Sequence, residues 1–235
     1  MLRYINYDHV SIPMNTKWRN IGISLSGGAD SAMLTYLICS NTSANIHIST
    51  QIRCWKTRPW QSYVSEQVYN WFVDRFQNLK FKRHTNLIPP ELEWGSIGPT
   101  IIDEYKKLKS GNQIILRSFN EYLAHTESLD AWFGGINMNP DIKIEGALED
   151  RNKGHIAPII EHMGVLVIHP FVHTKKDWII RQYRKNNILD LLNITRSCEG
   201  EFEGLNYKTY KPGQPVPICG KCFWCQERDW ALRCE

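Results

Sequence analysis

The sequence lacks a long hydrophobic run. A membrane-spanning helix needs roughly 18 uninterrupted apolar residues, and the 235-residue chain contains no such stretch. The segment from Met1 to His9 also has no apolar core of the kind that a signal peptide carries. We therefore expect a cytoplasmic protein with no membrane partner.

The sequence also lacks internal repeats, low-complexity tracts and a strong charge of either sign. Apolar residues make up 42% of the chain and charged residues 22%, which is an ordinary globular composition and argues against disorder. The net charge of +4 is too small to indicate a nucleic-acid surface by itself. We therefore expect a folded protein without a nucleic-acid partner.

Segments with the pattern of strands alternate with segments that have the pattern of helices. Strands are expected at 20–25, 44–52, 131–135 and 165–168, and helices at 32–39, 62–77, 120–130 and 177–186. Pro and Gly residues between 86 and 100 predict a loop, either a substrate lid or a plain connection. The alternation predicts an α/β fold with a parallel sheet and helices on both faces.

A glycine turn follows the first predicted strand. From Ser24 to Ser31 it reads Ser-Leu-Ser-Gly-Gly-Ala-Asp-Ser. Gly27 and Gly28 have no Cβ, so the backbone can turn sharply and lie close to an anion. The helix that follows offers unpaired N–H groups and the positive end of its dipole. Asp30 suits a helix cap or Mg²⁺ better than a phosphate. The turn therefore predicts a phosphate site, and the alternative is an ordinary capped turn.

The same turn excludes two common nucleotide motifs and resembles a third. It lacks the Gly-Lys-Ser/Thr ending of a Walker loop, and the chain has no Gly-x-Gly-x-x-Gly string. It resembles the SGGxDS motif of the PP-loop ATP pyrophosphatases. That resemblance implies a Rossmann-type fold and cleavage of ATP between its α- and β-phosphates, with AMP transferred to a substrate oxygen.

Four cysteines near the C-terminus have the spacing of a metal site. They follow the pattern C-x20-C-x2-C-x2-C, as Cys198, Cys219, Cys222 and Cys225. Zn²⁺ takes four thiolates tetrahedrally, and four cysteines leave no open position, so we expect a structural zinc site. Redox chemistry, an iron–sulfur cluster and unligated thiols are the alternatives. The remaining cysteines, Cys39, Cys54 and Cys234, are interpreted as buried or incidental.

Together, the glycine turn and the cysteine tail resemble the 7-cyano-7-deazaguanine (preQ0) synthase, or QueC, family over most of the chain. The matching segments are 117–137, 170–177, 195–198 and 219–228. The resemblance implies that ATP adenylates the carboxylate of 7-carboxy-7-deazaguanine. Ammonia then gives an amide, and a second adenylation drives dehydration to the nitrile. It also implies a PP-loop ATP-binding domain over 1–195 and a C-terminal zinc-binding region over 196–235.

The resemblance assigns roles to individual residues. ATP is expected on Ser24, Ser26, Gly27, Gly28, Asp30 and Ser31. Catalytic roles fall on Asp30, on Arg117 and on Lys175 or its neighbour Lys176, although each cation has the alternative of lying on a solvated helix start. Substrate contacts are expected from Gly135 and Asn137. The implied cofactors are ATP, Mg²⁺ and Zn²⁺, the implied partners are the 7-deazaguanine derivative and ammonia, and the family predicts a homodimer.

Two departures from the family concern the substrate. Asn137 to Lys143 stands where the family carries a Tyr-Pro-Asp-Cys-Arg stretch, and the interval from Cys198 to Cys219 is longer than usual. Two other functions therefore stay open. One is a PP-loop enzyme that adenylates another substrate, such as a tRNA base for thiolation. The other is a nucleotide-binding protein without catalysis.

Overall fold

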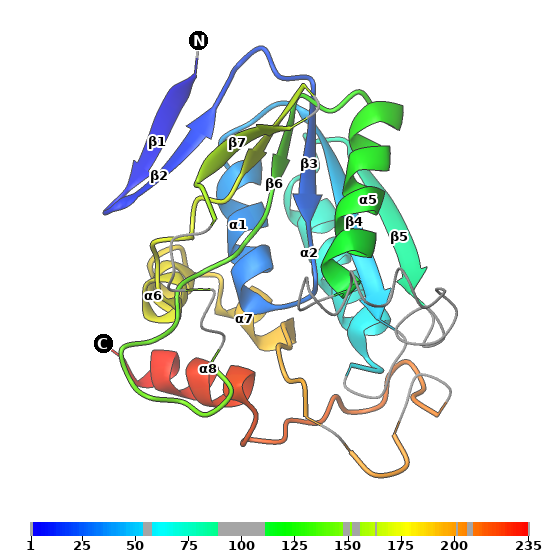
Figure 1. Ribbon diagram of the computed structural model, residues 1–235, viewed down its shortest axis with the longest axis vertical. Helices are drawn as coiled ribbons and strands as arrows, with labels where there is room; N and C mark the ends of the chain where they lie inside the picture. Colours follow the sequence, from blue (N-terminus) through cyan, green and yellow to red (C-terminus); the bar gives the residue numbers. More distant parts are fainter. Residues whose placement is uncertain are drawn as a thin grey trace.

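The computed structural model describes residues 2–53, 58–88, 111–147, 151, 156–162, 164–200, 202–205 and 209–234, and the side chains of 53, 87–88 and 111–118 are outside this description. Its centre is a six-stranded sheet with the order β5-β4-β3-β6-β8-β7 (Figure 1). The strands are β3 (Asn20–Ser24), β4 (Asn45–Arg53), β5 (Phe81–Ile88), β6 (Ala131–Phe133), β7 (Ile159–His162) and β8 (Val165–Ile168).

All neighbouring strands of this sheet are parallel except β7 and β8. The predicted α/β class with a mainly parallel sheet is therefore confirmed, with one antiparallel edge strand that the sequence did not predict. Only residues 163 and 164 separate β7 from β8. Such a short connection joins antiparallel strands, because a parallel pair needs a crossover of a dozen or more residues.

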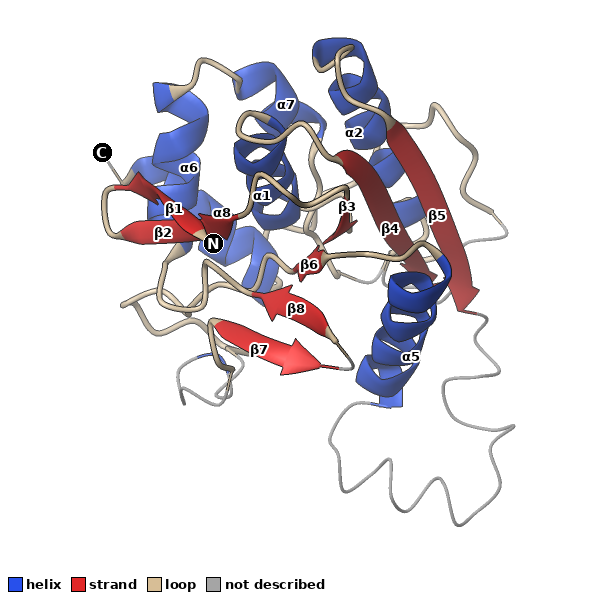
Figure 2. Cartoon of the chain, turned by 90° about the horizontal axis from the view of Figure 1, so that it is seen from above, coloured by secondary structure: helices blue, strands red, loops and turns tan. Residues whose placement is uncertain are grey.

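Helices cover both faces of the sheet (Figure 2). One face carries α1 (Ala29–Cys39), α2 (Gln61–Arg75), α6 (Lys176–Lys185) and α7 (Leu189–Ile194), and the other carries α5 (Gly111–Thr126). The last helix, α8 (Phe223–Arg233), packs against α6. The central strand β3 is buried on both faces, and its Ile21 and Ile23 are fully buried. This double burial fits its sequence, in which the three middle residues, Ile21, Gly22 and Ile23, carry no polar side chain.

Several elements were not predicted from the sequence. They are the hairpin of β1 (Arg3–Tyr7) and β2 (Val10–Met14), and β5, β7, α7 and α8. β5 reads Phe-Lys-Arg-His-Thr-Asn-Leu-Ile, so polar residues occupy both of its faces and no apolar alternation is visible. In α8, a buried position is occupied by Cys225, so the apolar periodicity of the helix is less visible in the sequence.

The C-terminal tail shares the core of the sheet domain. Cys198, Cys225 and Ala231 belong to the same buried cluster as the residues of β3 and α1. The boundary expected between residues 195 and 196 stays a prediction. Of the loop expected at 86–100, residues 86–88 instead belong to β5, and residues 89–100 lie outside the described part of the chain.

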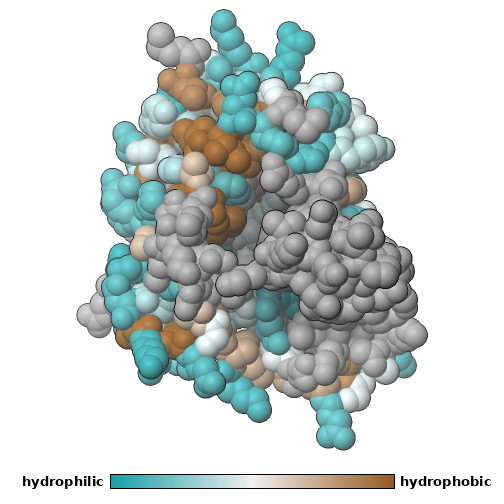
Figure 3. Space-filling model, viewed as in Figure 1, coloured by the Kyte–Doolittle hydropathy of each residue, from teal (hydrophilic) through white to brown (hydrophobic). Residues whose placement is uncertain are grey.

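The described helices include none long and apolar enough to cross a membrane. On the face drawn in Figure 3, hydrophobic side chains gather over β7, and most of the surrounding surface is hydrophilic. β7 is an edge strand whose Ile160 is 41% exposed. The predicted homodimer stays a prediction.

The strand order reverses beside β3. From β3 the chain moves outward through β4 to β5, and then returns to place β6 on the other side of β3. In open parallel sheets, ligands bind beyond the carboxyl ends of the strands at such a switch point. The turns after β3 and β6 therefore mark where a ligand site is expected.

Candidate functional site

The glycine turn lies at this switch point, between the carboxyl end of β3 and the first turn of α1. Gly27 has a φ of +83°, which is the left-handed region that suits glycine. Gly28 is the N-cap of α1 and gives it no side-chain cap among the described residues. The first N–H groups of a helix have no partner within the helix. The turn therefore presents main-chain donors and a helix dipole at one point.

Two serine hydroxyls hold the shape of the turn. The Oγ atoms of Ser26 and Ser31 lie 3.1 Å apart, and the Ser31 hydroxyl donates to the Gly28 carbonyl at 3.1 Å. The N–H groups of Ser26 and Gly28 donate to Ser31 Oγ and Ser26 Oγ at 3.2 and 3.3 Å. These contacts organise the turn before a ligand arrives. Ser24 ends β3, and its Oγ accepts a hydrogen bond from Trp132 at 3.0 Å.

Two other segments pack directly onto the turn. A Cβ on Gly135, just after β6, would lie 3.1 Å from the backbone of Ser31, so any other residue would require this backbone to move slightly away. A Cβ on Gly28 would lie 3.0 Å from Ser197 Oγ, and the Arg196 N–H donates to the Gly27 carbonyl at 2.9 Å. The turn is thus enclosed by the β6 turn on one side and by the start of the cysteine tail on another.

A buried group of four charges lies behind the turn. Lys176, the first residue of α6, has a fully buried side chain whose Nζ is 3.0 Å from Asp30 Oδ2 and 2.8 Å from Glu227 Oε2. Arg151 donates to Glu227 Oε1 at 2.6 Å and to Asn137 Oδ1 at 2.7 Å. Two cations therefore face two carboxylates, which is how buried charges are tolerated. We refer to Asp30, Lys176, Glu227 and Arg151 as the buried charge cluster.

The surroundings shift the pKa values within this cluster. Burial alone would lower the pKa of the Lys176 ammonium, but the carboxylates of Asp30 and Glu227 outweigh burial and hold the pKa above its ordinary value. Burial raises the pKa of the Asp30 carboxyl, and the charge of Lys176 works against that rise. Lys176 therefore keeps its charge. Asp30 Oδ1 is buried and has no hydrogen-bond partner within the described part of the chain.

The other residues predicted for the site lie in different surroundings. Lys175 is a partly exposed N-cap of α6 whose Nζ contacts Asp141 at 2.5 Å, so of the two neighbouring lysines it is Lys176 that reaches Asp30. Arg117 lies in α5, but its side chain is outside the described residues. Asn137 is 3% exposed and directs its amide at Arg151 and Glu227. The polar atoms of Asn137 thus have partners within the protein.

The sequence did not predict Glu227 or Arg151 as part of the site. Glu227 follows the last cysteine of the cluster by two positions, inside the Cys-Gln-Glu-Arg string that supports the family resemblance. Arg151 stands in a polar, irregular stretch. A single buried carboxylate or guanidinium leaves no periodic signal, because its burial depends on partners distant in sequence.

The four predicted cysteines converge. Their sulfur atoms all lie within 4.8 Å of one another, and Sγ of Cys219 is 3.9 Å from Sγ of Cys225. Backbone N–H groups point at the sulfurs: those of Gly200 and Cys219 donate to Cys198 Sγ at 3.4 Å, and that of Cys222 donates to Cys219 Sγ at 3.2 Å. The geometry therefore suits a metal held by thiolates.

The pKa of one of these thiols shows the effect of the amides. Burial raises the pKa of Cys219, but the N–H groups of Cys222 and Lys221 outweigh it and bring the pKa to about 7. A depressed thiol pKa favours the thiolate, which is the form that binds metal. Burial instead raises the pKa of the Cys198 and Cys225 thiols, so the lowered pKa is confined to Cys219 among these three.

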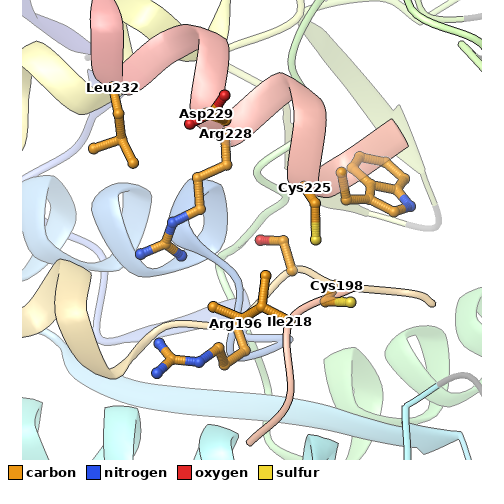
Figure 4. Close-up of a pocket in the computed structure, with 9 residues that line it drawn as sticks. Arg196, Cys198, Ile218, Cys225, Arg228, Asp229 and Leu232 are labelled. Atoms are coloured by element: carbon orange, nitrogen blue, oxygen red, sulfur yellow. The ribbon is translucent and has the colours of Figure 1, made fainter. Parts of the chain in front are cut away.

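A cavity of about 200 Å³ adjoins the cysteine cluster (Figure 4). Cys225 on α8 and Cys198 on the opposite wall border it. The rest of its lining consists of Arg196, Ser197, Ile218, Trp224, Arg228, Asp229 and Leu232. Because Arg196 also binds the glycine turn through its N–H, one wall of this cavity is attached to the candidate phosphate site.

A second group of metal-ligand types was not predicted. His47, His84 and Glu127 place ligand atoms within 4.8 Å of one another. However, the two imidazoles are hydrogen-bonded to each other at 3.2 Å, and Lys82 contacts both oxygens of Glu127 at 2.6 and 2.7 Å. These side chains lie between β4, β5 and the end of α5. Their polar atoms are therefore already paired with one another or with Lys82.

Comparison with known proteins gives distant structural likeness. No protein-family model and no curated protein sequence matches the chain. One similar structure is the U34-tRNA thiolase NcsA from Methanococcus maripaludis with its [4Fe-4S] cluster, at 16% identity and a TM-score of 0.45, covering 92% of this chain and 66% of the thiolase. This chain thus spans just under two thirds of the length of that protein.

Two further structures are similar at the same level. Phosphoadenylyl-sulfate reductase from Candida auris, in a phosphate complex, has 10% identity and a TM-score of 0.42 over 80% of this chain and 84% of its own. The NH3-dependent NAD synthetase from Campylobacter jejuni, in complex with nitrate, has 16% identity and a TM-score of 0.44 over 76% and 69%. Likeness this distant carries no argument about activity.

Proposed function

We propose that this chain is an ATP-dependent enzyme of the PP-loop type that adenylates a carboxylate and then joins it to ammonia. The substrate proposed is 7-carboxy-7-deazaguanine or a close analogue, and the product is its amide or nitrile. The observation that carries the ATP chemistry is the glycine turn at 26–31, with its uncapped helix start at the switch point of the sheet. The substrate is supported by the sequence resemblance alone.

The residues of the turn fit the leaving half of ATP. Main-chain N–H groups and the hydroxyls of Ser26 and Ser31 hold the β- and γ-phosphates, where the helix dipole stabilises their charge. A substrate carboxylate oxygen attacks the α-phosphorus, the bond to the β-phosphate oxygen breaks, and pyrophosphate leaves. Ammonia then attacks the acyl carbon, AMP leaves with the carboxylate oxygen, and the amide results. For the nitrile, ATP adenylates the amide oxygen, which departs as AMP while nitrogen loses its protons.

Asp30 fits a magnesium ligand. Among the described residues, none is a hydrogen-bond partner of its Oδ1, while its Oδ2 lies 3.0 Å from Lys176 Nζ. A carboxylate oxygen is the ligand that Mg²⁺ prefers, and the ion would neutralise phosphate charge during transfer. Lys176 is fully buried, so its proposed role is to position Asp30 rather than to contact the phosphates.

The cysteine cluster fits zinc better than an iron–sulfur cube. With a Zn–S distance of about 2.3 Å, tetrahedral sulfurs lie about 3.8 Å apart, close to the 3.9 Å between Cys219 and Cys225. A four-iron cube binds each cysteine to a different iron and needs the sulfurs farther apart than the 4.8 Å limit that encloses these four. We therefore propose a structural zinc ion, held by Cys198, Cys219, Cys222 and Cys225.

The thiolation alternative gains little support from the remaining cysteines. Cys39 is 4% exposed, and burial raises the pKa of its thiol far above the ordinary range, so it is a poor nucleophile. Cys54 lies outside the described residues, and Cys234 is at the end of α8, distant in sequence from the glycine turn.

Pyrophosphate release tests the proposal. Purified protein with ATP, Mg²⁺, ammonia and 7-carboxy-7-deazaguanine is expected to release pyrophosphate and AMP, with the amide or nitrile identified by mass spectrometry. Asp30→Asn, which keeps the side-chain shape, is expected to lower turnover by at least about 100-fold, as for loss of one transition-state electrostatic contact. The matched control is Asp229→Asn on α8, an exposed carboxylate paired with Arg233.

Three outcomes separate the functions. Turnover with another acceptor but not with 7-carboxy-7-deazaguanine would keep the adenylation chemistry and overturn the substrate. ATP binding without pyrophosphate release for any acceptor would favour a non-catalytic nucleotide-binding protein. Full activity of Asp30→Asn would contradict the assignment of the turn.

A further inference from the structure

Helix α8 connects the cysteine cluster to the buried charge cluster behind the glycine turn. Cys222 is its N-cap, and Cys225 lies in its first turn. Glu227, two residues further, is fully buried and reaches Lys176. A single rigid element thus carries two metal ligands and one member of the buried charge cluster.

The buried charge cluster depends on Glu227. Lys176 Nζ lies between Asp30 at 3.0 Å and Glu227 at 2.8 Å, and Arg151 takes the other oxygen of Glu227 at 2.6 Å. Buried charges persist only when they are paired, and removal of one partner leaves the others uncompensated. The position of Lys176, and through it that of Asp30, is therefore sensitive to where α8 places Glu227.

A second connection joins the same two sites along the chain. The Arg196 N–H donates to the Gly27 carbonyl at 2.9 Å, and Cys198 follows two residues later. From α8, Arg228 donates to the carbonyl and hydroxyl oxygens of Thr195 at 3.0 Å each. The segment before Cys198 thus contacts the turn directly, through Arg196. Helix α8 contacts that segment, through Arg228 and Thr195.

From these contacts we infer that Glu227 is a positioning residue that couples the cysteine site to the nucleotide site. A metal ion that fixes the start of α8 holds Glu227 against Lys176, which orients Asp30 beside the glycine turn. A loaded cysteine site therefore favours the turn conformation that binds nucleotide. The inference rests on the proposed function in two respects, which are that nucleotide binds at 26–31 and that the four cysteines hold a metal ion.

Thermodynamic linkage gives a test that does not depend on turnover. If the metal tightens nucleotide binding, nucleotide must tighten metal binding by the same factor. The experiment follows the transfer of Zn²⁺ from the full chain to a chromophoric chelator, with and without saturating Mg²⁺ and α,β-methylene-ATP. From the equilibrium distribution of Zn²⁺ between protein and chelator, we expect nucleotide to lower the zinc Kd of the natural protein about 10-fold, and zinc removal to raise the nucleotide Kd by the same factor.

Variants show whether Glu227 carries the coupling. Glu227→Gln is expected to keep bound zinc but to bind nucleotide about as weakly as the zinc-free natural protein, so that nucleotide changes the zinc Kd by less than 2-fold, a roughly complete loss of linkage. The control Asp229→Asn, on the same helix but exposed, is expected to keep the 10-fold effect. Retention of the full effect in Glu227→Gln would overturn the role of Glu227.

The natural protein alone also decides the question. If nucleotide binds with equal affinity to zinc-loaded and zinc-free protein, the coupling is absent even where Glu227→Gln fails to fold. If the natural protein binds no nucleotide at all, the proposed function fails first. The two failures are therefore distinguishable.

Discussion

The glycine turn takes its donors from consecutive residues, 26–31, whereas the cysteine cluster takes its sulfurs from Cys198 and from Cys219 to Cys225, across an interval of 20 residues. The turn lies between a buried strand and a buried helix. Among the described residues of the interval between Cys198 and Cys219, there is no helix or strand. Backbone conformation therefore shapes the first region, and the convergence of four cysteine side chains shapes the second.

The two regions meet in the buried charge cluster. Asp30 comes from the turn, Glu227 from α8, the helix that also carries Cys225, and Lys176 joins them from α6. The comparison indicates that the locally built region tolerates changes elsewhere, except through this cluster and through the Arg196 N–H that donates to the Gly27 carbonyl. Substitutions in the turn, the tail and the contact between them test that idea.

The largest effect is expected at the contact itself. Lys176→Met removes the cation between two buried carboxylates, and breaking a buried ion pair typically costs about 3–5 kcal/mol in the free energy of unfolding. Chemical denaturation measures the loss. Lys185→Met, at the exposed end of the same helix, is the control and is expected to change stability by less than about 0.5 kcal/mol. Equal stability of both variants would show that the buried charges are not coupled.

A smaller but still large effect is expected in the tail. Cys222→Ser removes one ligand, and loss of a structural metal belongs with the substitutions that destabilise most, so we expect at least about 2 kcal/mol. For a chain of this size, that corresponds to a fall in Tm of about 4–8 °C. Zinc content and Tm are measured on the same sample. A variant that loses zinc but keeps its Tm would show that the metal does not support the tail.

The smallest of these effects is expected in the turn. Gly27→Ala puts a Cβ at a φ of +83°, which costs about 1–2 kcal/mol for an L-residue, and adds a 3.1 Å contact with the backbone of Ser65. Gly164→Ala has a similar φ of +77° but meets no described atom within 4 Å, so it isolates the backbone cost. Thermal unfolding of both is expected to rank Gly27→Ala as the less stable. The reverse order would show that the turn is loosely packed.

The sequence predicted the regions that follow local rules and missed those that depend on distant partners. Strand β3, the glycine turn and α1 were predicted because an apolar segment, two glycines and a polar helix start are adjacent in the chain. The cysteine cluster was predicted from spacing alone. Glu227 and Arg151 were missed because only the fold brings them to Lys176 and Asn137, and β5 was missed because its two faces are polar.

The lysine pair shows the same limit on a finer scale. Lys175 and Lys176 are adjacent, and the sequence did not distinguish which one faces the glycine turn. The register of α6 against α1 decides it, because Lys175 caps the helix at the surface while Lys176 points into the core. A difference of one position in the chain therefore places Lys175 in an exposed ion pair with Asp141 and Lys176 at the centre of the buried charge cluster.

The central claim is that the backbone of 26–31 binds the pyrophosphate half of ATP. A crystal structure of the protein with Mg²⁺ and α,β-methylene-ATP tests it most directly. We expect β- and γ-phosphate oxygens at hydrogen-bond distance, about 2.7–3.2 Å, from main-chain nitrogens of this turn. Phosphates bound elsewhere, with the turn empty at saturating nucleotide, would contradict the claim.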